Sequence, residues 1–481
     1  MKITRFCVYT IIIILFTACS DRPDPSALFN RLVTEYERGN FQKLSDLTDS
    51  LRKAYPDETS LIRKADSILQ ISERIRLDYS LTAEQFIRRI ESYKLPYNDS
   101  ILSRWDKMNW SDRRIIDGEM MYFRRSPSNI VLLRLFHEDK EEQLLENSRD
   151  PELIARMDHT KKIIEASRKN KGPVFQVNMK INYTLKVDPD VVPEGEIIRC
   201  WLPWPRTNHP RQKKIEFISA SQKDFIFSPD SSIHKTIYME QKAVKGISAV
   251  FTVSFSYESS GLYVNPEDIE PELYDRESEL FKNYTREELP QIRFSDCTKK
   301  VADSITSPDD NPFETVSKIY LWFKENIPWT GALEYSTMPD IPAYVLNNRR
   351  GDCGMQTLLY ISMLRYKGIP VRWQSGWMVP PGHENLHDWC EIYFEGVGWV
   401  PSDISYDLQA NEDKTIRQFF MTGIDSYRLI VNDGIAGSLY PEKIHLRSEP
   451  YDFQRGEVEW KGGNLYFDKL DYNMDIEYFK D

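Results

Sequence analysis

The sequence predicts a multidomain α+β protein. It should have a helical N-terminal region, a β-sandwich-like region and a third region in which a helix packs on an antiparallel sheet. Three observations support this prediction. The chain has 481 residues, which is too long for a single hydrophobic core. Apolar residues recur every three or four positions before residue 170 and alternate with polar residues after residue 171. Beyond residue 350, a helical pattern and alternating patterns follow one another closely.

These changes of pattern, together with an N-terminal export signal, place the boundaries between the predicted segments. Lys171-Gly172-Pro173 marks the change from helical to strand-like sequence. The segments are a lipoprotein signal peptide at 1–18, a tether at 19–25, a helical domain at 26–170, a β-sandwich-like domain at 171–260, a domain at 261–440 that carries the candidate chemistry, and a C-terminal β segment at 441–481.

The N-terminus has the pattern of a bacterial export signal. Lys2 and Arg5 precede an apolar run from Phe6 to Phe16, which is too short to span a bilayer comfortably. The small residues before Cys19 resemble a lipobox, although Phe16 replaces the usual aliphatic residue. The resemblance implies cleavage before Cys19, diacylation of its thiol, and a lipid-anchored protein in the cell envelope, on the periplasmic face or the cell surface of a bacterium. An ordinary signal peptide or an uncleaved anchor is the alternative.

Composition and cysteine spacing narrow the kinds of protein and of metal site that the sequence is compatible with. Hydrophobic residues at 41% and charged residues at 28% are typical of a folded globular protein. The net charge of −11 and the lack of a long basic run argue against nucleic acid as a partner. Beyond the export segment the cysteines are Cys200, Cys297, Cys353 and Cys390, whose spacing matches no zinc or haem motif. A single Cys200–Cys297 bridge is left open.

Hydrophobic periodicity predicts helices in the first region and strands in the second. Leu28, Leu32, Leu44 and Leu51 repeat at helical spacing on either side of Gly39-Asn40, which predicts a helical hairpin. The helical region forms either a layer packed on the rest of the protein or an arm that binds a partner. Further helices are predicted at 83–92, 99–108, 110–124 and 150–169, and strands at 175–185, 197–202, 214–219, 233–240 and 249–257.

Residues 348–403 contain the residue types that point to chemistry. Cys353 opens a predicted helix, since Asp352 is a good N-cap and Gly368 ends the helical pattern. The free N–H groups and the dipole at a helix N-terminus favour an anion, so we expect them to lower the pKa of this thiol and to help bind an oxyanion. Cys353 is therefore a candidate nucleophile.

A histidine and an aspartate follow on predicted strands. Residues 387–394 alternate, which puts His387 and Cys390 on opposite faces of a strand. A hairpin turn returns the chain to Asp403, which can then lie beside His387. We expect the helix to pack across this sheet and to bring Cys353 to His387. The three residues would then be a nucleophile, a general base and an orienting carboxylate.

Four motifs carry a family resemblance, and they come in a characteristic order. They are Gly351-Asp352-Cys353-Gly354, Gly368-Ile369-Pro370-Val371-Arg372, His387-Asp388-Trp389-Cys390-Glu391-Ile392-Tyr393 and Gly398-Trp399-Val400-Pro401-Ser402-Asp403. This stretch resembles the transglutaminase-like superfamily, which has a papain-like fold. The resemblance covers 313–406 and implies a nucleophile at Cys353, a general base at His387 and an orienting acid at Asp403. It also implies a residue that assists the oxyanion, for which Trp329 is the candidate.

The sequence departs from the family pattern beside the implied catalytic residues. Asp388 and Cys390 replace the small or aliphatic residues that are common next to the histidine, and Ser402 is less usual before the aspartate. None of these changes removes an implied catalytic residue, so the resemblance favours an active enzyme. We interpret Glu391 and Trp389, on the same strand, as structural or cleft-lining residues.

Two alternatives compete with this interpretation. His383-Glu384-Asn385-Leu386-His387 matches the H-E-x-x-H zinc motif, which works only on a helix. Because Pro380-Pro381-Gly382 precedes it and a strand pattern begins at His387, we predict no metal site. Cys353 alone is compatible with an ordinary buried cysteine, but its combination with His387 and Asp403 favours catalysis.

The expected function is thus that of an exported cysteine enzyme without a cofactor. A thiol of this kind acts on amide or peptide bonds through an acyl-thioester, which water resolves in a peptidase or amidase and an amine resolves in an acyl transferase. The expected partners are a peptide, protein, glycopeptide or cell-wall peptide substrate, and the membrane through the lipid anchor at Cys19. A non-catalytic binding or scaffolding lipoprotein that retains the fold is the alternative.

Overall fold

A computed structural model describes residues 24–270, 272–406, 408 and 411–479. The predicted signal peptide and Cys19 lie outside the described residues. The described residues divide into two compact units, one within residues 24–73 and 115–119, the other within residues 74–114 and 120–479. Among the described helices, none is both long and apolar enough to cross a membrane.

The first unit contains the predicted helical hairpin. Helices α1 (Pro25–Glu37) and α2 (Phe41–Ala54) are joined at Gly39, which has a φ of 76° and so uses the left-handed conformation that glycine adopts at low cost. The apolar positions that predicted the hairpin are buried between the helices. They include Leu28, Leu32, Leu44 and Leu51.

A helical layer opens the second unit. It follows α3 (Thr59–Asp78) and consists of α4 (Ala83–Ser92), α5 (Asp99–Lys107), α6 (Ser126–His137), α7 (Lys140–Asn147) and α8 (Pro151–Ser167). Trp105, Trp110, Ile130 and Leu133 are buried in one apolar cluster within this layer. The helices predicted at 83–92 and 99–108 are thus confirmed.

The helix predicted at 110–124 is wrong. This stretch contains two short strands, β1 (Arg113–Ile116) and β2 (Glu119–Tyr122), on either side of Asp117-Gly118. Asp117 and Gly118 both have positive φ, at 50° and 88°, as the turn of a two-residue hairpin requires. An Asp-Gly pair favours this turn strongly, and the local signal outweighs the weak helical spacing around it.

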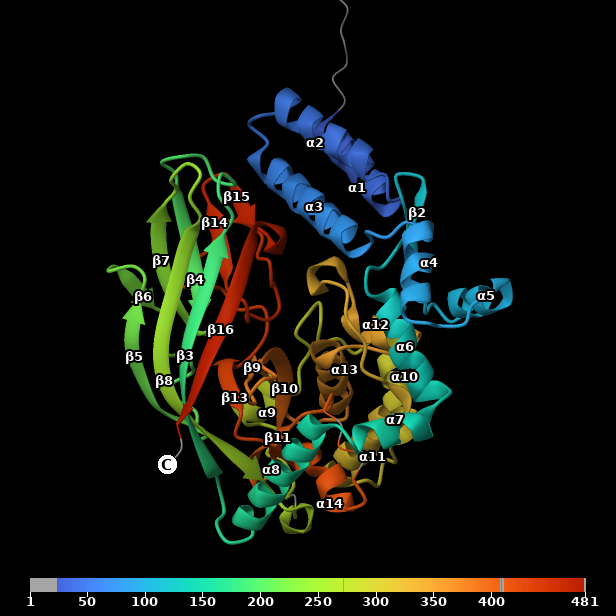
Figure 1. Cartoon of the computed structure of the whole chain (residues 1–481), viewed down its shortest axis with the longest axis vertical. Helices are drawn as coiled ribbons and strands as arrows, with labels where there is room; N and C mark the ends of the chain where they lie inside the picture. Colours follow the sequence, from blue (N-terminus) through green and yellow to red (C-terminus); the bar gives the residue numbers. More distant parts are fainter. Residues whose placement is uncertain (1–23, 271, 407, 409–410, 480–481) are drawn as a thin grey trace, which may run out of the picture. The chain divides into compact units, whose positions relative to one another are not determined.

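The β region consists of two five-stranded sheets that face each other (Figure 1). One has the order β12-β8-β3-β16, with β5 also pairing with β8, and the other has the order β15-β14-β4-β7-β6. The chain's last strands enter both sheets, so the C-terminal tail closes this region. The strands are β3 (Val174–Val187), β4 (Ile197–Pro203), β5 (Gln212–Ala220), β6 (Phe225–Phe227), β7 (Thr236–Lys242), β8 (Ala249–Tyr263), β12 (Gly423–Ile424), β14 (Glu457–Trp460), β15 (Gly463–Leu465) and β16 (Leu470–Phe479).

The core of these two sheets extends into a third, smaller sheet. That sheet has the order β11-β10-β9-β13, and its neighbours are antiparallel. Its Trp377 and Leu429 are buried in the same apolar cluster as Trp201 and Phe255 of the β region. The two regions therefore share one core. The strands of the small sheet are β9 (Val371–Met378), β10 (Asn385–Phe394), β11 (Gly398–Ser402) and β13 (Arg428–Asn432).

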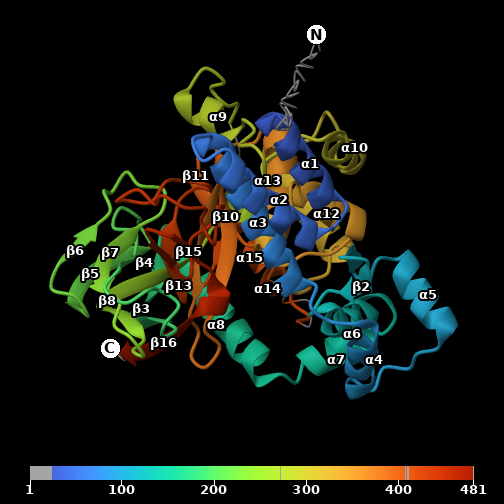
Figure 2. The same cartoon turned by 90° about the horizontal axis from the view of Figure 1, so that it is seen from above.

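Helix α13 (Cys353–Tyr366) packs between the small sheet and a group of helices (Figures 1 and 2). Its residues from Gly354 to Arg365 are buried, as expected for a helix that is covered on all sides. The surrounding helices are α10 (Asp296–Ile305), α11 (Pro312–Asn326) and α12 (Ile341–Asn348). The remaining elements are η1 (Pro266–Asp268), α9 (Glu279–Tyr284), η2 (Tyr335–Thr337), α14 (Lys414–Arg417), α15 (Phe419–Thr422) and η3 (Phe467–Lys469).

Candidate active site

Cys353 is the first residue of α13, and the start of this helix is held firmly. The Asp352 carboxylate caps it, accepting the Met355 N–H at 3.0 Å and the Tyr335 hydroxyl at 2.6 Å. One residue earlier, Gly351 forms a parallel bridge with Trp329. Cys353 is partly buried and lines a cavity at this capped helix N-terminus.

The helical layer supports the segment that leads into this helix. The Arg350 guanidinium donates to the Asp112 carboxylate at 3.0 Å, and both side chains are buried. A second guanidinium nitrogen donates to the Asn109 carbonyl at 2.8 Å. Breaking a buried pair of this kind is costly. Residues 109–112 of the layer therefore pack on the domain that carries Cys353.

His387 and Asp403 are in direct contact. His387 Nε2 lies 2.7 Å from Asp403 Oδ2, and the two residues are only 6% and 0% exposed. The hairpin makes this contact, because β10 and β11 pair with Cys390 opposite Ser402. The bond occupies Nε2 and leaves Nδ1 as the nitrogen available to a thiol. Burial lowers the pKa of His387, although the Asp403 charge acts in the opposite direction.

Arg428, which the sequence analysis missed, lies on the other side of Asp403. One of its guanidinium nitrogens is 3.0 Å from Asp403 Oδ2, and another donates to Asp425 at 2.8 Å. Burial would raise the pKa of Asp403, but His387 and Arg428 together hold it well below its usual range. The Ser405 hydroxyl and N–H donate to the second carboxylate oxygen. The only sequence signal for this role was an arginine at the start of the apolar run Leu429 to Val431.

Cys353 and His387 line one cavity of about 220 Å³. Trp329 and Tyr406 line it as well, and Trp329 is 45% exposed. Asp403 lies behind His387 and is not part of the lining. The structure therefore brings Cys353, His387 and Trp329 to one cavity. Asp403, the fourth predicted residue, is hydrogen-bonded to His387.

The helix packs on the face of β10 that carries Asp388. Alternation puts His387 and Asp388 on opposite faces of the strand. The Cys353 thiol donates a hydrogen bond to Asp388 Oδ2 at 3.4 Å, so α13 covers the Asp388 face. Among the described residues, no hydrogen bond joins the thiol to His387. His387 instead reaches the cavity from near the beginning of the strand, at the edge of the face that α13 covers.

This arrangement reverses the expected direction of the thiol pKa. Burial raises the pKa of Cys353 well above its usual range, and the charges of Asp388 and Asp352 raise it further. The Asp388 backbone N–H acts in the opposite direction. A helix N-terminus alone predicts a lowered pKa for this thiol. The carboxylates that face the sulfur oppose that effect, and tertiary packing brings them there.

The remaining unusual residues of β10 have structural roles. The Cys390 thiol is buried and donates to the Ser402 carbonyl at 3.4 Å. Glu391 is buried between Arg372, at 2.5 Å, and His209, at 3.2 Å. This network ties the β region to the small sheet and supports the interpretation of Glu391 as structural. All cysteines in the described part of the chain are free thiols, so Cys200 and Cys297 are not bridged.

The H-E-x-x-H segment does not have the geometry of a zinc protease motif. It is not helical, since strand β10 begins at Asn385. The two histidines therefore do not share a helix face. His383 Nδ1 lies 2.9 Å from a Glu152 oxygen of α8, which gives this histidine a different partner.

The sequence comparisons identify the domain around this site. Residues 299–404 match the family model of the transglutaminase-like superfamily. The uncharacterized protein YebA of Bacillus subtilis (strain 168) is 25% identical over 152 residues, a match that covers 25% of this chain and 20% of that protein. The chain thus spans about a fifth of the length of this curated relative.

Two solved structures resemble larger parts of the chain. One is a candidate cysteine protease from Cytophaga hutchinsonii, 13% identical, with a TM-score of 0.43, covering 63% of this chain and 92% of that one. The other is the periplasmic domain of TgpA from Pseudomonas aeruginosa, 14% identical, with a TM-score of 0.25, covering 55% of this chain and 96% of that one. Since both TM-scores are below 0.5, the assignment of residues 299–404 rests on the family model.

Proposed function

From the transglutaminase-like domain at residues 299–404 as premise, we propose that this protein is a cysteine enzyme that cleaves or exchanges amide bonds. Cys353 is the nucleophile, His387 the general base and Asp403 the orienting acid. The observation that carries the proposal is the 2.7 Å contact between His387 and Asp403, directly behind a cavity that Cys353 lines. This is the order of groups that thiol catalysis requires.

The proposed reaction begins when the Cys353 thiol turns from Asp388 to the Nδ1 atom of His387. His387 takes the thiol proton as the sulfur attacks the carbonyl carbon, and the charge moves to the carbonyl oxygen. The N–H groups at the start of α13 and the Trp329 indole N–H are the candidate donors to this oxyanion. His387 then gives its proton to the leaving amine, which departs as the acyl-thioester forms.

The second half of the reaction depends on the acceptor. Water attacking the thioester gives a peptidase or amidase, and an amine gives an acyl transferase. In both cases His387 accepts a proton from the attacking group and returns it to the sulfur. Buried Arg428 keeps Asp403 ionised throughout, so the imidazolium that forms twice in each cycle always has an anionic partner.

A second cavity supports an extended substrate. It has a volume of about 440 Å³ and meets the catalytic cavity at Arg156, which lines both. Its walls include Pro151 and Ala155 of α8, Pro380, and Tyr427. The lining also includes charged side chains such as Glu152, Lys162 and Asp425, and a recess of this size with both apolar and charged walls suits a peptide, protein, glycopeptide or cell-wall peptide.

The export signal supports a proposal for where in the cell the protein is located. Lipidation of Cys19 would anchor the enzyme in the bacterial cell envelope, with its body in water. Cells grown with an alkyne-tagged fatty acid should label the wild-type protein but not the Cys19→Ala variant. Equal labelling of the two proteins would contradict the anchor.

A specific observation also favours the alternative, a scaffolding lipoprotein that retains the fold. In the structure the thiol is bonded to Asp388 and not to His387, and burial raises its pKa. A thiol held permanently in this way would not turn over. The two functions differ in whether Cys353 ever becomes acylated.

Capture of an acyl-enzyme decides between them. The purified mature protein is mixed with a library of peptides, quenched in acid and digested, and adducts are located by mass spectrometry. We expect acyl adducts on Cys353, none in Cys353→Ala, and a strong reduction in His387→Ala. If a wide peptide library leaves Cys353 unmodified in the wild type, the scaffolding function is the better account.

A further inference from the structure

We propose that Asp388 is a catalytic residue that holds the Cys353 thiol protonated in the resting enzyme and releases it to His387 when substrate enters. The inference rests on the proposed function in one respect, namely that Cys353 is the nucleophile. It assigns a role to a residue that the family resemblance marked only as a departure from the pattern.

The contact between the two side chains is direct. The Cys353 sulfur lies 3.4 Å from Asp388 Oδ2, within the range of a hydrogen bond to sulfur. Asp388 is only 2% exposed, so water does not screen its carboxyl from the thiol. His387 and Cys353 line the same cavity, so Asp388 and His387 are the alternative partners that we assign to this thiol.

The carboxyl is held in place from behind. The Gln454 side-chain amide donates to Asp388 Oδ1 at 2.7 Å, and to the His387 carbonyl at 2.9 Å. Gln454 thus fixes both candidate partners of the thiol with one amide group. The backbone carbonyl of Gln454 accepts the Trp377 indole N–H at 2.8 Å, which anchors it to strand β9.

The helix leaves room for the carboxyl at one residue. A Cβ at Gly354 would lie 2.6 Å from Asp388 Oδ2 and 2.2 Å from the Tyr335 hydroxyl oxygen. Such contacts are closer than van der Waals packing permits, so only glycine lets Asp388 reach the start of α13. The position next to the nucleophile is therefore built to receive this carboxyl.

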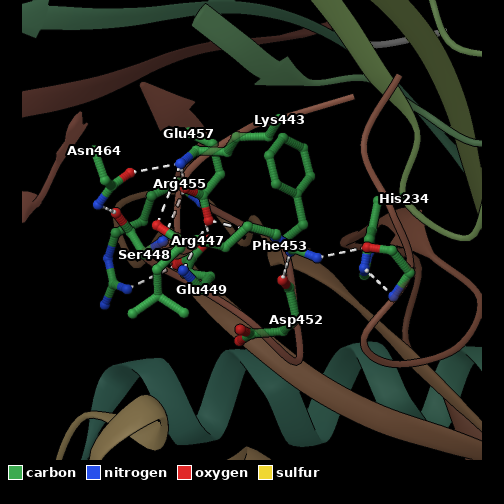
Figure 3. Close-up of polar contacts among 12 residues, drawn as sticks. His234, Lys443, Arg447, Ser448, Glu449, Asp452, Phe453, Arg455, Glu457 and Asn464 are labelled. Atoms are coloured by element: carbon green, nitrogen blue, oxygen red, sulfur yellow. Dashed lines mark hydrogen bonds and ion pairs between the residues drawn. The ribbon is translucent and has the colours of Figure 1, made fainter. Parts of the chain in front are cut away.

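The loop between β13 and β14 supplies Gln454, and polar contacts join several of its other residues to one another (Figure 3). The Glu449 carboxylate accepts the backbone N–H groups of Gln454 at 2.7 Å and of Arg455 at 3.0 Å. Glu457 in turn accepts the N–H of Glu449 at 2.8 Å. Arg447 donates to the Asp452 carbonyl. These buried charge-assisted bonds hold the amide of Gln454 against the catalytic strand.

The surroundings of Asp388 favour retention of a proton. Burial raises its pKa well above the usual range, and the charges of Asp452, Asp352 and Glu449 raise it further. The charged and titratable groups that face it come from α13, from η2 and from the loop between β13 and β14. They are Asp352, Cys353, Tyr335, Glu449, Asp452 and the nearby Arg447 and Arg455.

The chemical consequence is that ionisation of the Cys353 thiol has a high free-energy cost in the resting enzyme. A thiolate 3.4 Å from a buried carboxylate would be strongly repelled, so at least one proton remains on the pair. When the sulfur turns to His387, the proton moves to Nδ1, and the thiolate gains an imidazolium partner in place of a carboxylate. Deprotonation is thereby coupled to the approach of the thiol to its base.

The test is the pH dependence of alkylation of Cys353 by iodoacetamide, followed on the mature full-length protein by mass spectrometry. Asp388→Asn keeps the shape of the side chain, removes the negative charge that the carboxyl carries once it ionises, and can donate to a thiolate. We expect its alkylation midpoint to fall by about 1 to 3 pH units relative to the wild type, the range typical of a charge at contact distance. An unchanged or higher midpoint would overturn the proposal.

Two further variants make the result specific. Asp388→Ala introduces a small residue of the kind common at this position in the family, and it should also lower the midpoint if Asp388→Asn does not fold. Asp452→Asn removes a carboxyl from the same surroundings without touching the sulfur, so its shift should be smaller. Equal shifts in Asp388→Asn and Asp452→Asn would show that the total negative charge around the sulfur, and not the contact with Asp388, sets the pKa of the thiol. That result would overturn the proposal.

The outcome can be separated from that of the proposed function. Alkylation needs only an accessible sulfur, so the midpoint is measurable even if no peptide ever acylates the protein. Acyl-enzyme formation together with an unchanged midpoint would refute the role of Asp388 alone. A lowered midpoint without any acyl-enzyme would refute the enzyme function while leaving the Asp388 contact intact.

Discussion

The two faces of strand β10 carry neighbouring residues that meet very different electrostatic surroundings. On one face His387 contacts Asp403, whose carboxylate is paired with Arg428. On the other face Asp388 contacts a neutral thiol and has further carboxyls nearby. Asp403 and Asp388 are both buried, yet the pKa of the first is lowered and that of the second is raised. Burial alone therefore does not set the charge of a carboxyl here, whereas its cationic partners do.

The two faces of the strand therefore have different roles in the proposed reaction. The Asp403 face is permanently charged and orients the imidazole, which a general base requires. The Asp388 face retains a proton and keeps the nucleophile neutral. Substitutions that change the charge on one face should reduce the electrostatic difference between the two faces. They are described below from the largest expected effect to the smallest.

The largest effect is expected from Asp403→Asn. Loss of the carboxylate removes the group that fixes the His387 tautomer, and it should slow acylation of Cys353 by about 10⁴, as in the Ser-His-Asp triad. The measurement is the single-turnover rate of acyl-enzyme formation. Asp425→Asn is the matched control, because it removes a carboxylate from Arg428 without touching the imidazole. Comparable rates for wild type and Asp403→Asn would remove Asp403 from the mechanism.

Arg428→Met should cause the largest loss of stability. It leaves two buried carboxylates, Asp403 and Asp425, without their cation, which typically costs about 3 to 5 kcal/mol in the free energy of unfolding. Urea unfolding followed by tryptophan fluorescence measures the change. Arg88→Met is the control, since Arg88 also pairs with a carboxylate, that of Glu84, but both side chains are exposed, at 70% and 75%. A loss no greater than in this control would mean that the buried pair is not needed.

Gln454→Met should have a smaller effect on stability and a specific effect on the thiol. It leaves the His387 carbonyl and the Asp388 carboxyl without a buried donor, which costs about 1 to 3 kcal/mol. The alkylation midpoint of Cys353 should move as well, because Asp388 is no longer fixed. Gln374→Met removes a buried amide from the same sheet that bonds Trp389 and Glu391 instead. It should lower stability and leave the midpoint where it is.

The smallest expected effect is a difference in how stability depends on pH. The lowered pKa of Asp403 means that its stabilisation is present above the unfolded-state value and is lost as pH falls towards the folded-state value. The raised pKa of Asp388 has the opposite sign, so its contribution to stability is lost as pH rises. The stability of Asp388→Asn relative to the wild type should therefore be greatest at high pH. Unfolding midpoints at pH 4.5 and pH 8 measure this, and an advantage of Asp388→Asn only at pH 4.5 would contradict it.

The sequence by itself determined the parts of the site that are local in the chain. Cys353 at the start of a helix follows from its cap at Asp352 and the end of the pattern at Gly368. The contact between His387 and Asp403 follows from one hairpin of alternating residues. Both depend on the period of a helix or strand and on the residues at its ends, and neighbouring residues largely encode these.

Only the tertiary structure decided which groups surround the sulfur. The face of β10 that α13 covers, and hence the contact with Asp388, depends on how a helix and a sheet pack. Arg428 and Gln454 reach the site from strands and loops that are distant in sequence. A pKa is set by all charges within a few ångströms, so the direction predicted for Cys353 from its helix alone was wrong. Long-range packing brings those charges together, and no local pattern in the chain records it.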